Sequence, residues 1–218
     1  MMGAPNQQDD GESMTFNIDW SNFNSSLLIE VTRPNGVFTC SGVAINETTI
    51  LTAAHCLEGE IKRIRVFTQA SYNPKARSIK VKSFELHPEY NKDKSNYRCD
   101  LAKIRLDGNL PAGTNFYPII KREGELEGKI LRLGFGARSE SNTRTLITPV
   151  LKKLRKTEKV LELDDTYSYS GDSGGPVFLQ KDGQIYLVAI HSTLSFGPEG
   201  KYSFNPLLST HKAWIEAA

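Results

Sequence analysis

Short β-rich runs separated by turn residues recur about every ten residues along this chain. Several alternate polar and apolar residues, as in Ile79-Lys80-Val81-Lys82 and Lys103-Ile104-Arg105-Leu106, which places every second side chain on one buried face. Regularly spaced short strands are typical of β-sandwiches and β-barrels. The sequence therefore predicts an all-β fold of half-exposed antiparallel strands, at residues 27–31, 37–45, 61–68, 78–86, 101–106, 129–135, 146–154 and 185–193.

The length and charge of the chain limit its architecture and its partners. Its 218 residues can form one large β unit or two barrels of about a hundred residues each. The 27 Lys and Arg residues nearly balance the 25 Asp and Glu residues, so neither nucleic acid nor an acidic membrane surface is an expected partner. No apolar run approaches the ~18 residues of a membrane span, and no His, Cys or carboxylate cluster has metal-ligand spacing. We expect no membrane insertion, no metal and no cofactor.

The distribution of turn residues and polar residues predicts two units and a leader. Residues 1–13 are polar and lack the apolar stretch of a signal peptide, which predicts a flexible leader. Residues 107–114 are rich in Gly and Pro and read as the connection between two halves. Good helix formers and apolar residues in 209–218 predict one short packed helix. The predicted divisions are a first unit over 14–107, an interdomain linker over 108–120 and a second unit over 121–218.

Three separated segments carry residues suited to nucleophilic chemistry. The run Gly171-Asp172-Ser173-Gly174-Gly175-Pro176 places a serine in a glycine-dense turn, where successive N–H groups can converge on one point. A serine hydroxyl needs a neighbouring base, and His55 follows an apolar strand among small residues. Asp100 opens another apolar strand and could orient that imidazole. Each of these residues alone is better explained as a loop, turn or structural residue.

Together these segments resemble the chymotrypsin/trypsin-like serine proteases. The resemblance rests on Leu51-Thr52-Ala53-Ala54-His55-Cys56, Asp100-Leu101-Ala102-Lys103-Ile104 and the Ser173 segment, in the order His, Asp, Ser that distinguishes this family from subtilisins and α/β-hydrolases. Further similar segments are His87-Pro88-Glu89-Tyr90-Asn91, Gly134-Phe135-Gly136 and Lys212-Ala213-Trp214-Ile215. The resemblance extends over about residues 25–218.

The resemblance implies a fold of two antiparallel six-stranded β-barrels packed side by side, with a short C-terminal helix. His55 and Asp100 would come from the first barrel and Ser173 from the second. The implied activity is that of a serine endopeptidase, in which Ser173 attacks a peptide carbonyl, His55 transfers the proton and Asp100 orients His55. The N–H groups of Gly171 and Ser173 would form the oxyanion hole. Implied substrate-binding residues are Tyr167, Ser168, Tyr169, Ser170, Ser192, Thr193 and Leu194, with Ser192 also able to hydrogen-bond Asp100.

The specificity pocket departs from the family pattern. Tyr167 stands where an Asp selects Arg or Lys, so we expect a P1 preference unlike that of trypsin. A small shift of the loop could still bring Asp164 or Asp165 to the pocket floor. Leu194 replaces a glycine at the pocket mouth and Tyr169 replaces a bridging cysteine, which implies a narrower pocket, unless these side chains only pack the loop.

Activation is a second departure. In the family the residue at Asp172 pairs with a newly cut Ile or Val N-terminus, and residues 13–18 contain no such start. The chain is therefore either zymogen-like or satisfies Asp172 in another way, with a side-chain cation or hydrogen-bond donors.

The cysteines bear on the compartment and on rival functions. Cys40 and Cys56 have the spacing of the family's disulfide beside the catalytic histidine, and such a bond implies a secreted or periplasmic protein. Cys99 has no partner left and is expected to be a buried, inert thiol. The expected partner is a protein or peptide substrate, bound by a monomer. Rival readings are a catalytically silent binding protein on the same scaffold and a thiol enzyme using Cys56 or Cys99.

Overall fold

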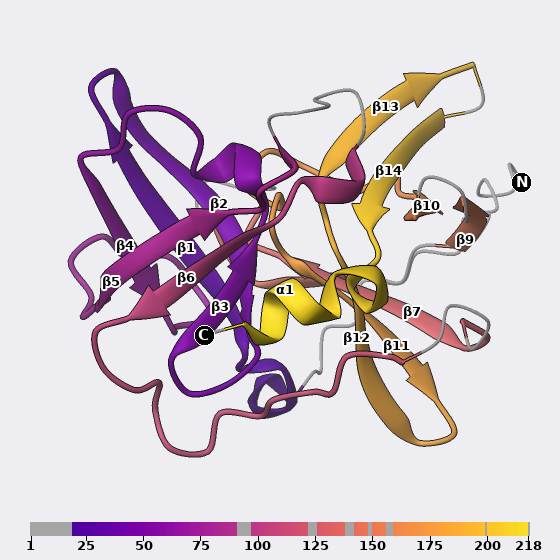
Figure 1. Cartoon of the computed structure of the whole chain (residues 1–218), viewed down its shortest axis with the longest axis horizontal. Coiled ribbons are helices and arrows are strands. Elements are labelled where there is room, and N and C mark those ends of the chain that lie inside the picture. The colour runs from indigo at the N-terminus through magenta and orange to yellow at the C-terminus, as the bar shows by residue number, and fades with distance from the viewer. Residues whose placement is uncertain are drawn as a thin grey trace, which may run out of the picture.

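The first half of the chain forms a closed antiparallel β-barrel (Figure 1). The computed structural model describes residues 19–90, 97–121, 126–137, 142–147, 150–155, 159–198 and 200–217, so the predicted leader lies outside the described residues. The barrel order is β1–β2–β3–β6–β5–β4. Its strands are β1 (Ser26–Arg33), β2 (Gly36–Ala44), β3 (Thr49–Thr52), β4 (Arg63–Phe67), β5 (Ile79–Leu86) and β6 (Ala102–Leu106).

Strand β1 shows why the barrel lies against the rest of the molecule. Leu27, Ile29 and Val31 alternate along it and point into the barrel core, as the two-residue period of a strand requires. Leu28 points to the opposite face and packs with Phe135 of the second half. Both faces of β1 are therefore buried, one by its own barrel and one by the neighbouring half.

The second half consists of two four-stranded antiparallel sheets. Their orders are β12–β11–β7–β8 and β13–β14–β10–β9. An isolated bridge between Ala189 and Leu207 joins the two sheets on one side, and their buried residues share one apolar core. The strands are β7 (Lys129–Gly134), β8 (Thr145–Ile147), β9 (Val150–Arg155), β10 (Val160–Asp164), β11 (Pro176–Lys181), β12 (Gln184–Ile190), β13 (Thr193–Gly197) and β14 (Gly200–Pro206).

The predicted all-β, chymotrypsin-like architecture is confirmed, with one difference in the second half. A second closed ring of six strands was expected, whereas the described strands form two sheets. Among the described residues β8 pairs with β7 and β9 pairs with β10. Strand β6 ends at Leu106 and β7 begins at Lys129; the predicted domain boundaries within this interval stay a prediction.

A shared core and a C-terminal helix hold the two halves together. Val43 and Leu51 of the barrel pack in one apolar cluster with Leu133 and Phe178 of the second half. The helical segments η6 (Leu208–His211) and α1 (Lys212–Glu216) lie across the junction (Figure 1). None of the helices in the described part of the chain combines the length and apolar character that a membrane span needs.

Candidate active site

His55 and Asp100 are brought together by adjacent barrel strands. His55 lies in η2 (Ala54–Cys56), directly after β3, and Asp100 lies between η4 (Tyr97–Cys99) and β6. Because β3 pairs with β6 with Thr52 opposite Ala102, the segments at the ends of these strands are neighbours. The sheet register therefore places the imidazole beside the carboxylate.

Asp100 is buried and holds His55 through two bonds. His55 Nδ1 lies 2.7 Å from Asp100 Oδ2, and the His55 backbone N–H donates to Asp100 Oδ1 at 2.9 Å. Ser192 Oγ donates to Asp100 Oδ2 at 2.5 Å, as the sequence led us to expect. Burial opposes ionisation of Asp100, but the hydrogen bonds and the charge of His55, with the bond from Ser192, outweigh it and lower the pKa of the carboxyl group. Asp100 therefore stays ionised.

The pKa of His55 shifts in the opposite direction. Desolvation disfavours its charged form, but the hydrogen bond that the ring donates to Asp100 and the negative charge of that group outweigh desolvation and raise the pKa of His55 above its usual 6.5. The imidazole side chain is 38% exposed, so one side of the ring faces solvent while Nδ1 faces Asp100. A base with this environment accepts a proton more readily than a free histidine does.

Ser173 comes from the second half, where it lies between β10 and β11. The sulfur of Cys56 is 4.0 Å from His55 Nε2 and 3.7 Å from the backbone oxygen of Ser173. Ser173 Oγ donates to the backbone oxygen of Ser192 at 3.4 Å, and not to His55, within the described residues. Ser192 thus contacts both Asp100 and Ser173. Bonds between a nucleophile and its base are often long before substrate binds.

The loop around Ser173 is shaped by its glycines and by Ser41. Gly171 and Gly174 have φ of +102° and +86°, and a Cβ on Gly174 would collide with the Ser41 carbonyl and with Thr52 Oγ1. Ser41 donates through Oγ to the Gly171 carbonyl at 2.7 Å and through N–H to the Ser173 carbonyl at 2.8 Å. The loop carbonyls therefore point toward β2. In the described part of the chain the N–H groups of Gly171 and Ser173 have no acceptor.

Asp172, next to Ser173, pairs with a buried arginine. Arg132 Nη1 of β7 lies 3.2 Å from Asp172 Oδ2. The N–H groups of Gly136 and Tyr169 donate to the same carboxylate at 2.8 and 2.9 Å. Arg132 also contacts Asp165, with Nε 2.5 Å from Oδ2 and Nη2 donating to Oδ1 at 2.8 Å. All three charged side chains are fully buried, so the cation and the N–H donors provide the compensation that a buried carboxylate requires.

The residues expected to bind substrate lie in two environments. Tyr167 and Tyr169 are exposed, whereas Ser168 is buried and hydrogen-bonds His191 Nε2 at 2.8 Å. Burial, followed by the charge of Arg132, lowers the pKa of His191 to about 4, so this imidazole is neutral. Ser170 lies in the same loop, and its carbonyl accepts the Ala137 N–H at 3.1 Å. Asp165 is occupied by Arg132 and Asp164 is exposed, so neither forms a buried acidic floor.

Thr193 and Leu194 lie on an edge strand. Strand β13 pairs with β14 on one side and is the end member of its four-stranded sheet. Both side chains are half-buried. An edge strand with unpaired backbone groups can accept an extended peptide as an additional strand.

Three residues that shape this site were not predicted from the sequence: Ser41, Arg132 and His191. Arg132 stands in the apolar run Ile130-Leu131-Arg132-Leu133, and a charged residue at such a position indicates a buried ion pair. Ser41 and His191 carry no comparable signal, since both lie among ordinary strand residues. Their roles follow only from contacts with distant segments.

The predicted Cys40–Cys56 disulfide is confirmed, and Cys99 is a free, buried thiol. Burial is the main cause that raises the pKa of Cys99, which agrees with the expectation of an unreactive thiol.

Comparisons with known proteins give one consistent result. The family model described as Trypsin matches residues 21–215. The chain is 26% identical over 216 residues to CLIP domain-containing serine protease B4 of Anopheles gambiae, covering 80% of this chain and 59% of that protein. It is 27% identical over 205 residues to coagulation factor IX of Cavia porcellus, covering 80% and 71%. It is 25% identical over 236 residues to phenoloxidase-activating factor 3 of Holotrichia diomphalia, covering 87% and 67%. The match spans about three fifths of the first of these relatives.

Proposed function

This chain belongs to the trypsin family of serine proteases, and from that premise we propose that it is a serine endopeptidase acting through Ser173, His55 and Asp100. The observation that carries the proposal is the buried Asp100 carboxylate, which binds His55 at Nδ1 and at the backbone N–H. A carboxylate in this position holds the imidazole in one tautomer, with Nε2 free to accept a proton.

The proposed reaction proceeds in two stages. Ser173 Oγ attacks the carbonyl carbon of the scissile bond, and its proton passes to His55 Nε2. The N–H groups of Gly171 and Ser173 donate to the oxyanion, each contributing ~3 kcal/mol in the transition state. The tetrahedral intermediate then expels the amine, which takes the proton from His55, and leaves an acyl-enzyme. Water, deprotonated by His55, hydrolyses this ester and restores Ser173.

The Arg132 pair supports an active chain over a zymogen-like one. In a zymogen-like form Asp172 would await a new N-terminal ammonium group. Here Arg132 and two backbone N–H groups already contact that carboxylate. We infer that the oxyanion loop is ordered without proteolytic cleavage.

Proposed substrates are proteins or peptides that bind in extended form along β13. The pairing of Asp165 with Arg132 supports a P1 preference unlike that of trypsin, because this carboxylate is not free to bind a basic side chain. The Cys40–Cys56 disulfide supports secretion or a periplasmic location, where such bonds persist. The proposed working state is a monomer.

Labelling with a fluorophosphonate probe tests this proposal. We expect an adduct on Ser173 in the folded chain and none in Ser173→Ala or His55→Ala, while Ser83→Ala, a change on the exposed face of β5, labels like the parent. Absence of an adduct in folded protein would instead support a silent binding protein. Labelling only after cleavage near residues 13–18, identified by N-terminal sequencing, would support the zymogen-like form.

A further inference from the structure

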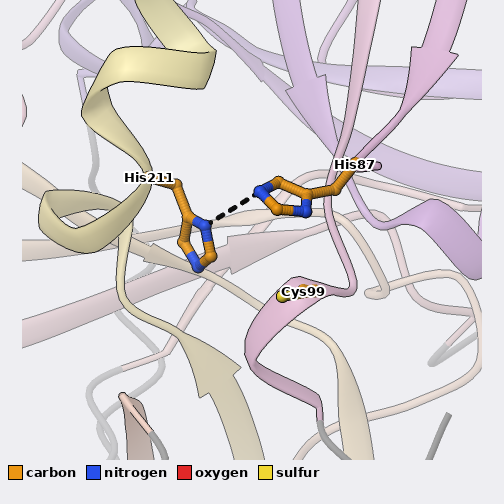
Figure 2. Close-up of side chains that lie close together, drawn as sticks. All are labelled: His87, Cys99 and His211. Atoms are coloured by element: carbon orange, nitrogen blue, oxygen red, sulfur yellow. Dashed lines mark hydrogen bonds between the residues drawn. The ribbon is translucent and has the colours of Figure 1, made fainter. Parts of the chain in front are cut away.

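Three buried side chains that take no part in the proposed reaction lie close together, and one of them, Cys99, is next to Asp100 in the sequence. His87 follows β5, Cys99 ends η4 and His211 ends η6, so three distant segments contribute one residue each (Figure 2). One nitrogen of each imidazole and the sulfur of Cys99 lie within 4.8 Å of one another. Each of the three side chains is more than nine-tenths buried.

The spacing of these atoms is close to that of a tetrahedral metal site. Two nitrogens bound to Zn²⁺ at ~2.0 Å lie ~3.3 Å apart, and a nitrogen and a thiolate lie slightly further apart. His87 Nε2 and His211 Nδ1 are already 3.1 Å apart. The Cys99 sulfur lies within 4.8 Å of one nitrogen of each imidazole, so it would move toward them when all three ligands bind one ion.

The hydrogen bonds of the metal-free site show which nitrogen of each imidazole faces the other ring. The Glu89 N–H donates to His87 Nδ1 at 3.2 Å, so the His87 ring carries its proton on Nε2 and donates it to His211 Nδ1. His211 therefore carries its own proton on Nε2, and its ring makes a hydrogen bond with the backbone of Arg98. The two nitrogens that face each other, His87 Nε2 and His211 Nδ1, are therefore the candidate metal ligands of the two rings.

We propose that His87, Cys99 and His211 bind one Zn²⁺ ion. Binding releases the thiol proton of Cys99 to solvent and moves the ring proton of His87 to Nδ1, which gives up the contact with Glu89 N–H. A thiolate with two neutral imidazoles is a ligand set that suits Zn²⁺ and not the oxygen-seeking Ca²⁺ or Mg²⁺.

The surroundings of the site bear on its charge and its fourth ligand. Thiolate and Zn²⁺ together carry one positive charge. Glu89 Oε2, 3.8 Å from the Cys99 sulfur, supplies a negative charge and a carboxylate near the fourth position. Arg98 and Lys159 also line this cavity of about 320 Å³. Their positive charges oppose binding of Ca²⁺ or Mg²⁺, which needs several negatively charged oxygen ligands, so any ion here depends on its bonds to the thiolate and the imidazoles.

The ion would connect the C-terminal helix to the segment that carries Asp100. His211 immediately precedes α1, and Cys99 immediately precedes Asp100. The His87 N–H also donates to the Leu101 carbonyl at 2.8 Å. We expect bound Zn²⁺ to raise the melting temperature of the whole chain, because it binds only the folded arrangement. The site is independent of the proposed proteolysis.

Cobalt substitution tests the site directly. The metal-free chain, carrying Ser173→Ala to prevent self-cleavage, is titrated with Co²⁺ and then with Zn²⁺. We expect one Co²⁺ per chain, visible bands of a four-coordinate ion, and a near-ultraviolet thiolate-to-cobalt band that Zn²⁺ abolishes. Cys99 is the only free thiol, so that band reports this site alone.

Variants separate this site from other histidines. Cys99→Ser should lose the thiolate band, and His211→Gln, which keeps the thiol, should weaken Co²⁺ binding by at least ~10-fold. His55→Ala, which removes the exposed histidine, should leave both unchanged. Circular dichroism verifies folding, and His211→Gln carries the test if Cys99→Ser does not fold. A folded parent without the thiolate band, or a band that persists in Cys99→Ser, overturns the proposal.

Discussion

At the scale of single residues, the Asp100 carboxylate determines the chemistry available to His55. It accepts the ring and backbone N–H groups of His55 and the hydroxyl of Ser192 while remaining buried. Such a group acts on the base in two ways, since it fixes the tautomer and favours the charged imidazolium that forms during proton transfer.

The acid limb of the activity profile should reflect the raised pKa of His55. Protonated His55 cannot accept the proton of Ser173, so activity appears as pH rises through this pKa. We expect the midpoint of the acid limb of kcat/KM to lie above 6.5, the usual value for histidine. Rates on a peptide substrate over a pH series measure it, and a midpoint below the usual histidine value would contradict the assignment.

Replacing Asp100 should change both rate and profile. Asp100→Asn keeps the size of the side chain but removes its charge, so kcat should fall roughly 10⁴-fold. The acid limb should also move to lower pH, because the interaction that raises the pKa of His55 is lost. Asp107→Asn, at an exposed position after β6, is the control and should retain the parental profile.

At the scale of elements, one arginine on β7 contacts the segment after β10 and the segment before β11 that contains Ser173. Arg132 lies on β7, Asp165 follows β10, and Asp172 precedes β11. The ion pair between Arg132 and Asp172 holds the Ser173 segment against β7. A charged side chain in a core strand is tolerated here because its single positive charge contacts two carboxylates.

Removing this arginine should affect stability and activity together. Arg132→Met leaves Asp165 and Asp172 buried without a cation, so we expect a loss of about 3–5 kcal/mol in the free energy of unfolding, measured in urea. Activity should also fall at temperatures where the protein stays folded. Adding Asp165→Asn should recover part of the stability, since the two residues are coupled.

An exposed ion pair on α1 serves as the control for the buried Arg132 cluster. Lys212 and Glu216 are 3.6 Å apart and both are exposed, so Lys212→Gln should cost less than about 0.5 kcal/mol. An equal loss in Arg132→Met and Lys212→Gln would mean that the buried cluster is not structurally important.

Strand prediction worked for only some of the segments in which alternation was visible. The runs at 78–86 and 101–106 correspond to β5 and β6. Residues 79–82 of β5 are half-buried and exposed in turn, but β6 is buried on both faces apart from half-buried Arg105, so the expectation of a half-exposed strand is wrong for β6. The run at 146–154 overlaps β8 and β9, which pair with β7 and β10 respectively, and its residues 148–149 lie outside the described residues. Strands β3, β10, β11, β13 and β14 were not predicted, although polar and apolar residues alternate over 161–164 in β10 and over 193–196 in β13.

At the scale of the whole molecule, the C-terminal end of the described residues is hydrogen-bonded to the first barrel. Lys103 of β6 is 1% exposed and donates through Nζ to the carbonyls of Trp214 and Ala217 at 2.8 and 3.1 Å. It also pairs with Glu85 at 2.6 Å. One buried ammonium group thereby satisfies carbonyls at the C-terminal end of α1 and joins it to the barrel.

Lys103→Met should loosen this connection. The methionine fills a similar volume but leaves the Trp214 carbonyl without its donor, whereas the Ala217 carbonyl keeps its hydrogen bond from Arg105 at 2.9 Å. The free energy of unfolding should therefore fall by about 1–3 kcal/mol. Urea denaturation followed by tryptophan fluorescence measures it, because Trp214 lies in the helix. Lys82→Met, an exposed lysine on β5, should be neutral; equal stability of both variants would show that the helix is held by other contacts.

The sequence by itself determined the all-β class, the family and the Cys40–Cys56 pairing, because alternation and motif spacing are local properties of the chain. It also identified His55, Asp100 and Ser173 as the residues to examine, whose roles stay a proposal. Only the tertiary structure decided that Arg132 pairs with Asp172 and that His87, Cys99 and His211 meet. Those contacts join residues that are separated in the sequence, and the packing of strands and of the C-terminal helix, not local sequence, sets the distances between them.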